Sequence, residues 1–159
     1  MRGQKKSGFT LIEILVVIGI IAILATIVII AINPSRQFAQ ARNSQRVSNV
    51  NAILNAIGQN IADNKGLFTC AQSLGATAEI GSGVAHGDID TCIIPTYMPS
   101  MTVDPGNATV FATAPYYTDP THYDSGYTVA QDATGRVTVC APGGVEPSIA
   151  GSTAICVTR

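Results

Sequence analysis

The sequence predicts an α+β fold, in which a long N-terminal helix packs against a small C-terminal antiparallel β-sheet. Residues 14–32 are apolar except for Thr26, and a helix of that length crosses about 30 Å of hydrocarbon. Beyond this run, apolar residues recur at spacings of three and four, as on one face of a helix. The C-terminal part instead holds short runs rich in valine and threonine, which are typical of strands.

The helical pattern extends from residue 9 to about residue 64, which corresponds to ~80 Å at ~1.5 Å per residue. We expect residues 9–33 to form a transmembrane half and residues 34–65 an amphipathic half. The apolar stripe of the second half consists of Val47, Val50, Leu54, Ile57 and Ile61, and Arg42, Arg46 and Asn49 are placed on the surface around it.

Two features define the ends and the break of this helix. Pro34 lacks an N–H group and disfavours helical geometry at Asn33, so a kink or local break is expected there. Asn33 also suits the N-cap of a restarting helix with Pro34 at its first position. Lys65 and Gly66 are typical of a helix C-terminus.

The remaining residues, 66–159, are expected to form a globular head. Residues 66–99 lack periodicity and predict a loop-dominated connection with a short helix near residues 71–74. Strands are predicted at residues 110–112, 127–130, 137–140 and 153–157, with a turn-prone stretch at residues 117–126 and a hairpin connection at residues 131–136.

An ionisable residue, Glu13, lies at the edge of the apolar run. A carboxylate near the centre of a bilayer costs on the order of 2.5–3.5 kcal/mol, so Glu13 requires a functional explanation. An ordinary secretory signal has an apolar core of about 7–15 residues followed by a small-residue cleavage site. Here the apolar run is longer, and the small residue, Gly8, precedes it.

These residues resemble a known family. The basic leader followed by Gly8-Phe9-Thr10-Leu11-Ile12-Glu13 is similar to the prepilin signature of type IV pilins and pseudopilins. The resemblance implies that a prepilin peptidase removes residues 1–8 by cutting between Gly8 and Phe9, and then N-methylates Phe9. It also implies that Glu13, which finds no cationic partner in a waiting subunit, neutralises the terminal amine of a neighbouring subunit during assembly, and that the helix around Pro34 can unwind in a filament.

The distribution of charge predicts which part of the chain lies on each side of the membrane. The net charge is −1, and three of the nine basic residues, Arg2, Lys5 and Lys6, lie in the leader. They predict a cytoplasmic N-terminus, with the rest of the chain beyond the cytoplasmic membrane. Without the leader, the chain has six basic and ten acidic side chains. The remaining arginines are scattered, so the sequence does not favour nucleic-acid binding.

Four cysteines, Cys70, Cys92, Cys140 and Cys156, fall in the expected exterior part. Two disulfides are expected in an oxidising compartment, and three connectivities are possible. We favour Cys70–Cys92 and Cys140–Cys156, because sequential pairing closes two short loops. Structural zinc is disfavoured because the sequence has no C-x-x-C and its two histidines, His86 and His122, lie far apart.

No enzyme motif is present: the sequence has no G-x-S-x-G, P-loop, H-E-x-x-H or G-x-G-x-x-G. His122 lies among Asp119, Tyr123 and Asp124, but the spacing does not match a standard calcium loop, so no metal or other cofactor is predicted. Residues 107–109 form a glycosylation-type sequon too short to carry weight. The five tyrosines fit either an adhesive surface or packing within a sheet; they are Tyr97, Tyr116, Tyr117, Tyr123 and Tyr127.

The resemblance implies a structural subunit of a type IV pilus-like surface filament, without enzymatic activity. Its expected partners are other copies of the chain in a helical homopolymer, the prepilin peptidase, the pilus assembly platform, minor pilins and the cytoplasmic membrane. The cysteines and a head rich in small residues favour a pilin over the alternative, a pseudopilin of a type II secretion system or competence pilus. A second alternative is a monomeric membrane-anchored extracytoplasmic binding protein, in which Glu13 would be dispensable.

Overall fold

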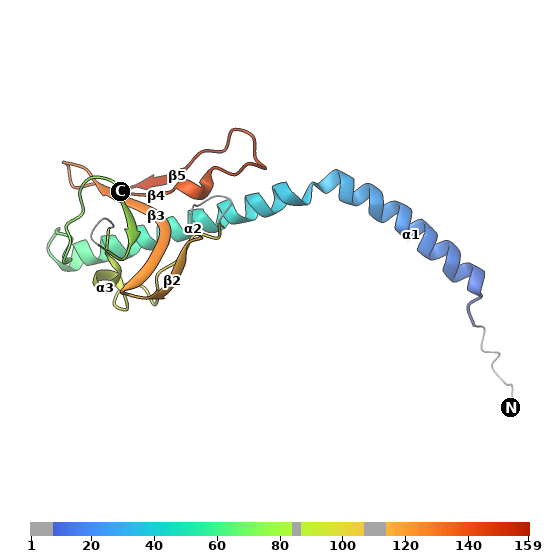
Figure 1. The fold of residues 1–159 in the computed structure, drawn as a ribbon, viewed down its shortest axis with the longest axis horizontal. Helices are drawn as coiled ribbons and strands as arrows, with labels where there is room; N and C mark the ends of the chain where they lie inside the picture. Colours follow the sequence, from blue (N-terminus) through green and yellow to red (C-terminus); the bar gives the residue numbers. More distant parts are fainter. Residues whose placement is uncertain (1–7, 84–86, 107–113) are drawn as a thin grey trace, which may run out of the picture. The chain divides into compact units, whose positions relative to one another are not determined.

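The computed structural model describes residues 8–83, 87–106 and 114–159. The chain divides into two compact units, residues 1–37 and residues 38–159, and each is described by itself. The first unit contains helix α1 (Leu11–Ile32). The second, called the head unit, contains most of helix α2 (Pro34–Asp63) and all five strands (Figure 1).

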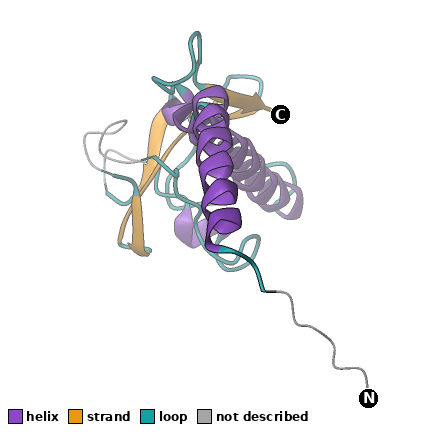
Figure 2. Cartoon of the chain, turned by 90° about the vertical axis from the view of Figure 1, so that its right-hand side faces the viewer, coloured by secondary structure: helices purple, strands orange, loops and turns teal. Residues whose placement is uncertain are grey.

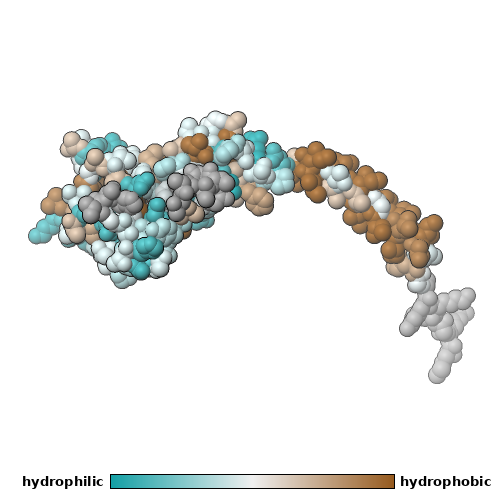
Figure 3. All heavy atoms as spheres, viewed as in Figure 1, coloured by the Kyte–Doolittle hydropathy of each residue, from teal (hydrophilic) through white to brown (hydrophobic). Residues whose placement is uncertain are grey.

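All side chains of helix α1 except Glu13 and Thr26 are apolar, and none is buried. The face of this helix seen in Figure 3 is mostly hydrophobic. Among the described residues it is the one helix that is long and apolar enough to cross a membrane. Its polar Thr26 hydroxyl donates a hydrogen bond to the Ala22 carbonyl at 2.9 Å, which satisfies that hydroxyl within the helix.

The helical chain is interrupted just before Pro34. Helix α1 ends at Ile32, Asn33 adopts a left-handed conformation with φ 45°, and α2 begins at Pro34. The Asn33 side-chain oxygen accepts hydrogen bonds from the Arg36 N–H at 3.4 Å and from the Ser35 hydroxyl at 2.8 Å. Asn33 therefore caps the restarting helix.

Helix α2 ends as its sequence indicates. Lys65 and Gly66 both have positive φ, and the Gly66 N–H donates to the Ile61 carbonyl at 2.8 Å. That bond spans five residues, as in a Schellman motif, and it occupies a carbonyl that the helix end would otherwise leave unpaired.

The sheet is antiparallel and is built around its longest strand, β3 (His122–Gln131). Strand β1 (Ala78–Gly81) and strand β2 (Tyr116–Asp119) both pair with β3; since Asp124 pairs with a residue of each, they lie on opposite edges of it. Strand β4 (Val137–Ala141) pairs with the second half of β3, and β5 (Ile155–Thr158) pairs with β4. The α+β prediction is confirmed.

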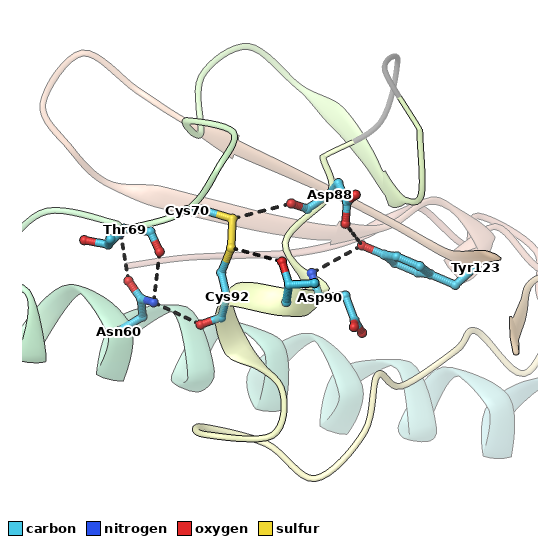
Figure 4. The surroundings of a disulfide bond; sticks show 8 residues. Asn60, Thr69, Cys70, Asp88, Asp90, Cys92 and Tyr123 are labelled. Atoms are coloured by element: carbon cyan, nitrogen blue, oxygen red, sulfur yellow. Dashed lines mark hydrogen bonds between the residues drawn. A yellow bond between two sulfur atoms is a disulfide. The ribbon is translucent and has the colours of Figure 1, made fainter. Parts of the chain in front are cut away.

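Two short helical segments complete the head unit. Helix α3 (Asp90–Ile93) lies in the connection between β1 and β2, and a 3₁₀ turn (Pro142–Gly144) follows β4. Figure 2 shows that much of the rest of this unit is loop. Side chains of α2 form hydrogen bonds with these loops. Asn60, for example, accepts a hydrogen bond from the Thr69 N–H at 2.9 Å and donates one to the Cys92 carbonyl at 3.1 Å (Figure 4).

The core lies between α2 and the inner face of the sheet. Alternate residues of β3 and β4 are buried, which is the pattern of a sheet with one covered face. The expected helix stripe is partly wrong: Val47 is 46% exposed, and Ile53 and Ala56 are buried instead. The contacting core side chains of α2 are Val50, Ile53, Leu54, Ala56 and Ile57.

Several local expectations for the head are corrected. Residues 71–74 form no helix, and the sequence analysis missed β1 and α3. Residues 117–126, expected to be turn-prone, form most of β2 and the first half of β3, because only residues 120–121 are needed for the turn. The strands expected near residues 127–130, 137–140 and 153–157 are present as β3, β4 and β5, whereas the one at residues 110–112 lies outside the described residues.

Both disulfides have the pairing favoured from the sequence. Cys70–Cys92 closes a loop with a sequence separation of 22, and Cys140–Cys156 closes one with a separation of 16. The second disulfide joins directly opposed residues of β4 and β5. It therefore holds the segment between these two strands, residues 142–154, at both of its ends.

Candidate functional site

The residues around the expected cleavage point precede the first helix. Gly8, Phe9 and Thr10 are exposed and lie outside α1, and the Phe9 side chain is 86% exposed. Thr10 is the N-cap residue of α1, with extended backbone angles. The bond between Gly8 and Phe9 therefore lies in non-helical chain, which is the form that a peptidase active site accepts most readily.

Glu13 is bonded within its own subunit. Its Oε2 accepts hydrogen bonds from the Thr10 N–H and the Thr10 hydroxyl, both at 2.7 Å, while the Glu13 N–H donates to the Thr10 Oγ1 at 3.3 Å. This is a capping box, in which the N-cap and third helical residues satisfy each other. Oε1 accepts no hydrogen bond from the part of the chain that the structure describes.

This arrangement refines the expectation that Glu13 has no partner before assembly. The carboxylate has no cationic partner among the described residues, but two neutral donors offset part of its desolvation cost. Thr10 was missed from the sequence in this role. The pattern Thr-x-x-Glu just before an apolar run does indicate a capping box, so the sequence contained the evidence.

A second cluster of polar side chains lies inside the head unit and was not expected. Arg46, on α2, has no exposed surface and forms a bidentate ion pair with Asp104, with both N···O distances 2.8 Å. Its Nη1 also donates to the Glu146 Oε1 at 2.5 Å. Arg42, one turn earlier, forms a second bidentate pair with Glu146 at 2.7 and 2.6 Å.

Opposite charges balance in this cluster: two guanidinium groups face two carboxylates. Hydrogen bonds from Arg42 are the main reason that the pKa of Glu146 is lowered to about 2, with Arg46 adding to the effect and burial opposing it. Burial lowers the pKa of Arg46, but the hydrogen bonds that it donates to Asp104 and Glu146 and the charges of these carboxylates outweigh burial and raise its pKa. The hydrogen bonds that Arg42 donates to Glu146 likewise raise the pKa of Arg42. Arg42, Arg46 and Glu146 therefore stay ionised over the physiological pH range.

Neutral neighbours extend the network and show its structural role. Asn49 donates to the Tyr127 hydroxyl at 2.8 Å, and burial raises the pKa of Tyr127 to about 12. Asn43 donates to the Gly144 carbonyl at 3.2 Å. The placement of Arg46 and Asn49 on the surface of α2 is therefore wrong, because both are buried, whereas the Arg42 side chain stays 34% exposed. All three side chains bond loops of the head to the helix.

The described residues form no metal-binding cluster of three or more His, Cys, Asp or Glu side chains. His122 lies at the exposed start of β3, where its ring is 4.9 Å from that of Tyr116. Tyr123 and Tyr127 are buried core residues, as packing in a sheet requires, whereas Tyr97, Tyr116 and Tyr117 are partly buried. His86 and the sequon at residues 107–109 lie outside the described residues.

Comparison with known proteins identifies the N-terminal site. A family model described as a prokaryotic N-terminal methylation motif matches residues 3–29. The chain matches no curated protein and no solved structure. The match contains Gly8, Phe9 and Glu13 and most of α1. The chain therefore carries the prepilin motif of type IV pilins and pseudopilins.

Proposed function

We propose that this chain is the structural subunit of a type IV pilus-like surface filament. It is inserted in the cytoplasmic membrane through α1, cut between Gly8 and Phe9, N-methylated at Phe9 and polymerised through its N-terminal helix. The observation that carries the proposal is Glu13, the one ionisable side chain of α1, in register with Gly8 and Phe9 at the start of a helix that is otherwise apolar except for Thr26.

The exposed, non-helical chain at Gly8 and Phe9 supports the processing step. Residues 1–8 would be the leader, and its basic side chains would keep it on the cytoplasmic face, where the peptidase acts. Residues 9–33 would then form the membrane and filament-core helix, residues 34–65 the amphipathic half, and residues 66–159 the head outside the membrane.

The capping box supports the assembly step. Thr10 and Glu13 both remain after removal of residues 1–8, so the carboxylate stays fixed at the first turn of the helix. An N-terminal amine from a neighbouring subunit would reach it in an apolar surround, where attraction between opposite charges is strong and an unpaired charge is costly. Only the axial position that joins the two groups would be stable, so Glu13 would set the register between subunits.

Features of the head support its location outside the cytoplasmic membrane. Its two disulfides suit an oxidising compartment, and its buried ion pairs hold loops that would otherwise depend on a small apolar core. The mature head would be a stable domain carried on the surface of the filament. A pseudopilin would be processed and assembled through the same N-terminal motif. The location of the filament, on the cell surface or within the cell envelope, therefore distinguishes a pilin from a pseudopilin.

Three substitutions of Glu13 test the proposal. Glu13→Ala and Glu13→Lys remove or reverse the charge, while Glu13→Gln keeps a side chain that completes a capping box but cannot neutralise an amine. We expect all three subunits to be inserted and cleaved, and all three to give less than about a tenth of the normal yield of sheared filaments. The control is Asp63→Asn, at an exposed position at the C-terminal end of α2.

Mass spectrometry of the sheared material supplies the second readout. The proposal expects a mature chain that begins at Phe9, carries one added methyl group and has lost four thiol protons to two disulfides. Normal filament yield from Glu13→Gln would contradict the proposed charge pairing but leave the rest of the proposal standing. Uncut, monomeric protein in the membrane would instead favour the anchored binding protein and overturn the filament subunit as a whole.

A further inference from the structure

A groove in the head unit has no role in either site described above. It lies between the second half of α2 and the end of the β3–β4 hairpin, and its volume is about 480 Å³. Its lining is mostly apolar, with Leu54, Ile57 and Ile61 from α2 and Val137 from β4. We call it the α2 groove. Its volume lies in the range of sites that bind a ligand or a projecting side chain.

The α2 groove offers few polar groups to an occupant. Helix α2 has no ionisable side chain between residues 47 and 62. Among the described residues that line the groove, Arg159 is the one with a charge, and its guanidinium donates hydrogen bonds to the side-chain oxygens of Asn51 and Asn55. Sites for small molecules add several convergent polar groups that orient the ligand. This groove therefore fits an apolar side chain better than a polar small molecule.

Two exposed apolar side chains lie at the opposite end of the head unit. Phe38 on α2 is 64% exposed, and Val145, in the segment between β4 and β5, is 53% exposed. Figure 1 shows this segment reaching back beside the first turns of α2. The next residue, Glu146, is paired with Arg42, which lies one helical turn after Phe38. The ion pair therefore fixes Val145 near the turn that carries Phe38, and we call these two side chains the apolar knob.

The knob cannot fill the groove of its own subunit. Phe38 and Gly58, which lines the groove, are twenty residues apart on α2, which corresponds to ~30 Å at ~1.5 Å per residue. A projection at one end of a molecule and a recess at the other end join copies in series. Such heterologous contacts extend into open helical filaments when they do not close into a ring.

We propose that the apolar knob of one subunit docks in the α2 groove of a second copy of this chain within the filament. The inference rests on the proposed function, because the polymer is what brings the two surfaces together. Docked copies are offset by ~30 Å along α2, the distance between knob and groove.

The size of the groove favours a second copy over a free partner protein. Ten residues line it, whereas a stable interface contains about 20–30 residues a side. The contact is therefore too small to hold two free molecules together. Subunits that are already joined through their N-terminal helices present the knob at a high effective concentration, and a weak contact is then populated.

Cross-linking of sheared filaments tests the contact. Val145→Cys and Ala62→Cys place one thiol in the knob and one in the groove; Asn43, which bonds the residue before Val145, is ~28 Å from Ala62 along α2. The natural cysteines are paired, so a short bismaleimide reacts only with the introduced thiols and cannot join them within one chain. We expect covalent dimers and larger multimers on a denaturing gel, and monomer from each single variant.

Two further substitutions remove the contact without changing the core. Phe38→Gln removes the knob, and Gly58→Leu fills the groove, where a Cβ atom on Gly58 meets no heavy atom within 4 Å. Leucine also favours a helix over glycine, so the head should stay folded. In the double-cysteine background we expect either change to lower the multimer yield at least about tenfold, because burial of one phenylalanine side chain changes an association constant by that factor or more.

Matched controls make the same chemical changes elsewhere. Leu67→Gln removes an apolar side chain that is 73% exposed and lies outside both the groove and the knob. Ser48→Leu adds a leucine at an exposed position of α2 that does not line the groove. Both should leave the multimer yield unchanged. Equal amounts of every variant in the membrane, with both disulfides formed, show that the head is folded.

Three results would overturn this inference and leave the filament subunit standing. One is normal filaments in which the double-cysteine variant stays monomeric. Another is cross-linking that persists in both Phe38→Gln and Gly58→Leu. The third is a small apolar molecule that the purified full chain retains in native mass spectrometry and that Gly58→Leu loses, because the groove would then be a ligand site. Absence of filaments from the unmodified chain would instead overturn the proposed function, and this inference with it.

Discussion

At the residue scale, Arg46 is the least expected feature of the head. It is a fully buried cation on a helix whose sequence places it on the outside, and its two carboxylate partners are 58 and 100 residues away in the chain. Desolvating a guanidinium and two carboxylates costs several kcal/mol per group, and close bidentate contacts offset that cost only while every partner is present. The cluster therefore stabilises one arrangement of the loops rather than the head in general.

Removal of one member of this cluster should be severe. Arg46→Met fills similar space but leaves Asp104 buried without its bidentate partner and Glu146 with only Arg42. We expect a loss of about 3–5 kcal/mol in the free energy of unfolding, measured by denaturant titration. Arg136→Met, at an exposed position in the hairpin turn, should change stability by less than about 0.5 kcal/mol. Equal effects from the two variants would contradict the structural role of the cluster.

The pKa of Glu146 makes the same cluster sensitive to acid. Because its pKa is lowered from 4.5 to about 2, the folded head releases this proton more readily than the unfolded chain. The stabilisation, about 3 kcal/mol, is present above the ordinary pKa and is lost as pH falls from about 5 towards 2. Glu146→Gln should therefore be less stable than the natural chain at pH 7 by a similar amount, and unfolding titrations should show the difference shrinking in acid. A difference that stays constant with pH would refute this assignment.

At the element scale, the segment between β4 and β5 is restrained by a disulfide at its ends and by polar contacts with α2. The Cys140–Cys156 disulfide closes it, Glu146 ties it to two arginines, and Asn43 bonds the Gly144 carbonyl. Gly144 is also required for packing, because a Cβ atom there would lie 2.8 Å from the Thr153 carbonyl oxygen. The disulfide and the ion pairs thus restrain the same piece of chain.

Shared restraint predicts non-additive energies. Replacement of Cys140 and Cys156 by serine should cost about 2–4 kcal/mol. Combined with Arg46→Met it should cost less than the sum, because the released segment lets Glu146 reach water. Replacement of Cys70 and Cys92 by serine is the matched control: that loop contains neither Asp104 nor Glu146, so its cost should add to that of Arg46→Met within about 0.5 kcal/mol. Both cycles are measured by denaturant unfolding.

Local patterns explain which elements were predictable. Helix breaks and ends follow from nearest neighbours, so Asn33, Pro34 and Gly66 were sufficient for α1 and α2. Strand β1 was missed because its four residues, Ala-Glu-Ile-Gly, carry a single large apolar side chain. At the N-terminal site Gly8, Phe9 and Glu13 form one continuous motif, whereas the buried cluster is assembled from residues far apart in the sequence, and nothing local to Arg46 indicates its burial.

At the scale of the whole molecule, the two units are built for different surroundings. Every side chain of α1 is exposed and nearly all are apolar, so this helix is stable only where lipid or other helices cover it. The described part of the head unit has its own core, both disulfides and the buried ion pairs, all from residues after Gln37. A unit with its own core and covalent closures satisfies the requirements for independent folding.

The head unit should therefore fold in water without α1. A chain of residues 38–159, oxidised to form both disulfides, is expected to be a soluble monomer that unfolds cooperatively, as measured by circular dichroism and sedimentation. The control begins at residue 47 and lacks buried Ala39 and both arginines of the ion-pair cluster. It should unfold at least about 5 °C lower, since a loss of 1 kcal/mol shifts the midpoint of a domain of this size by about 4 °C and several kcal/mol are removed. Aggregation of the longer fragment under oxidising conditions would mean that the membrane helix contributes to the fold of the head, and equal midpoints would mean that the arginine cluster does not.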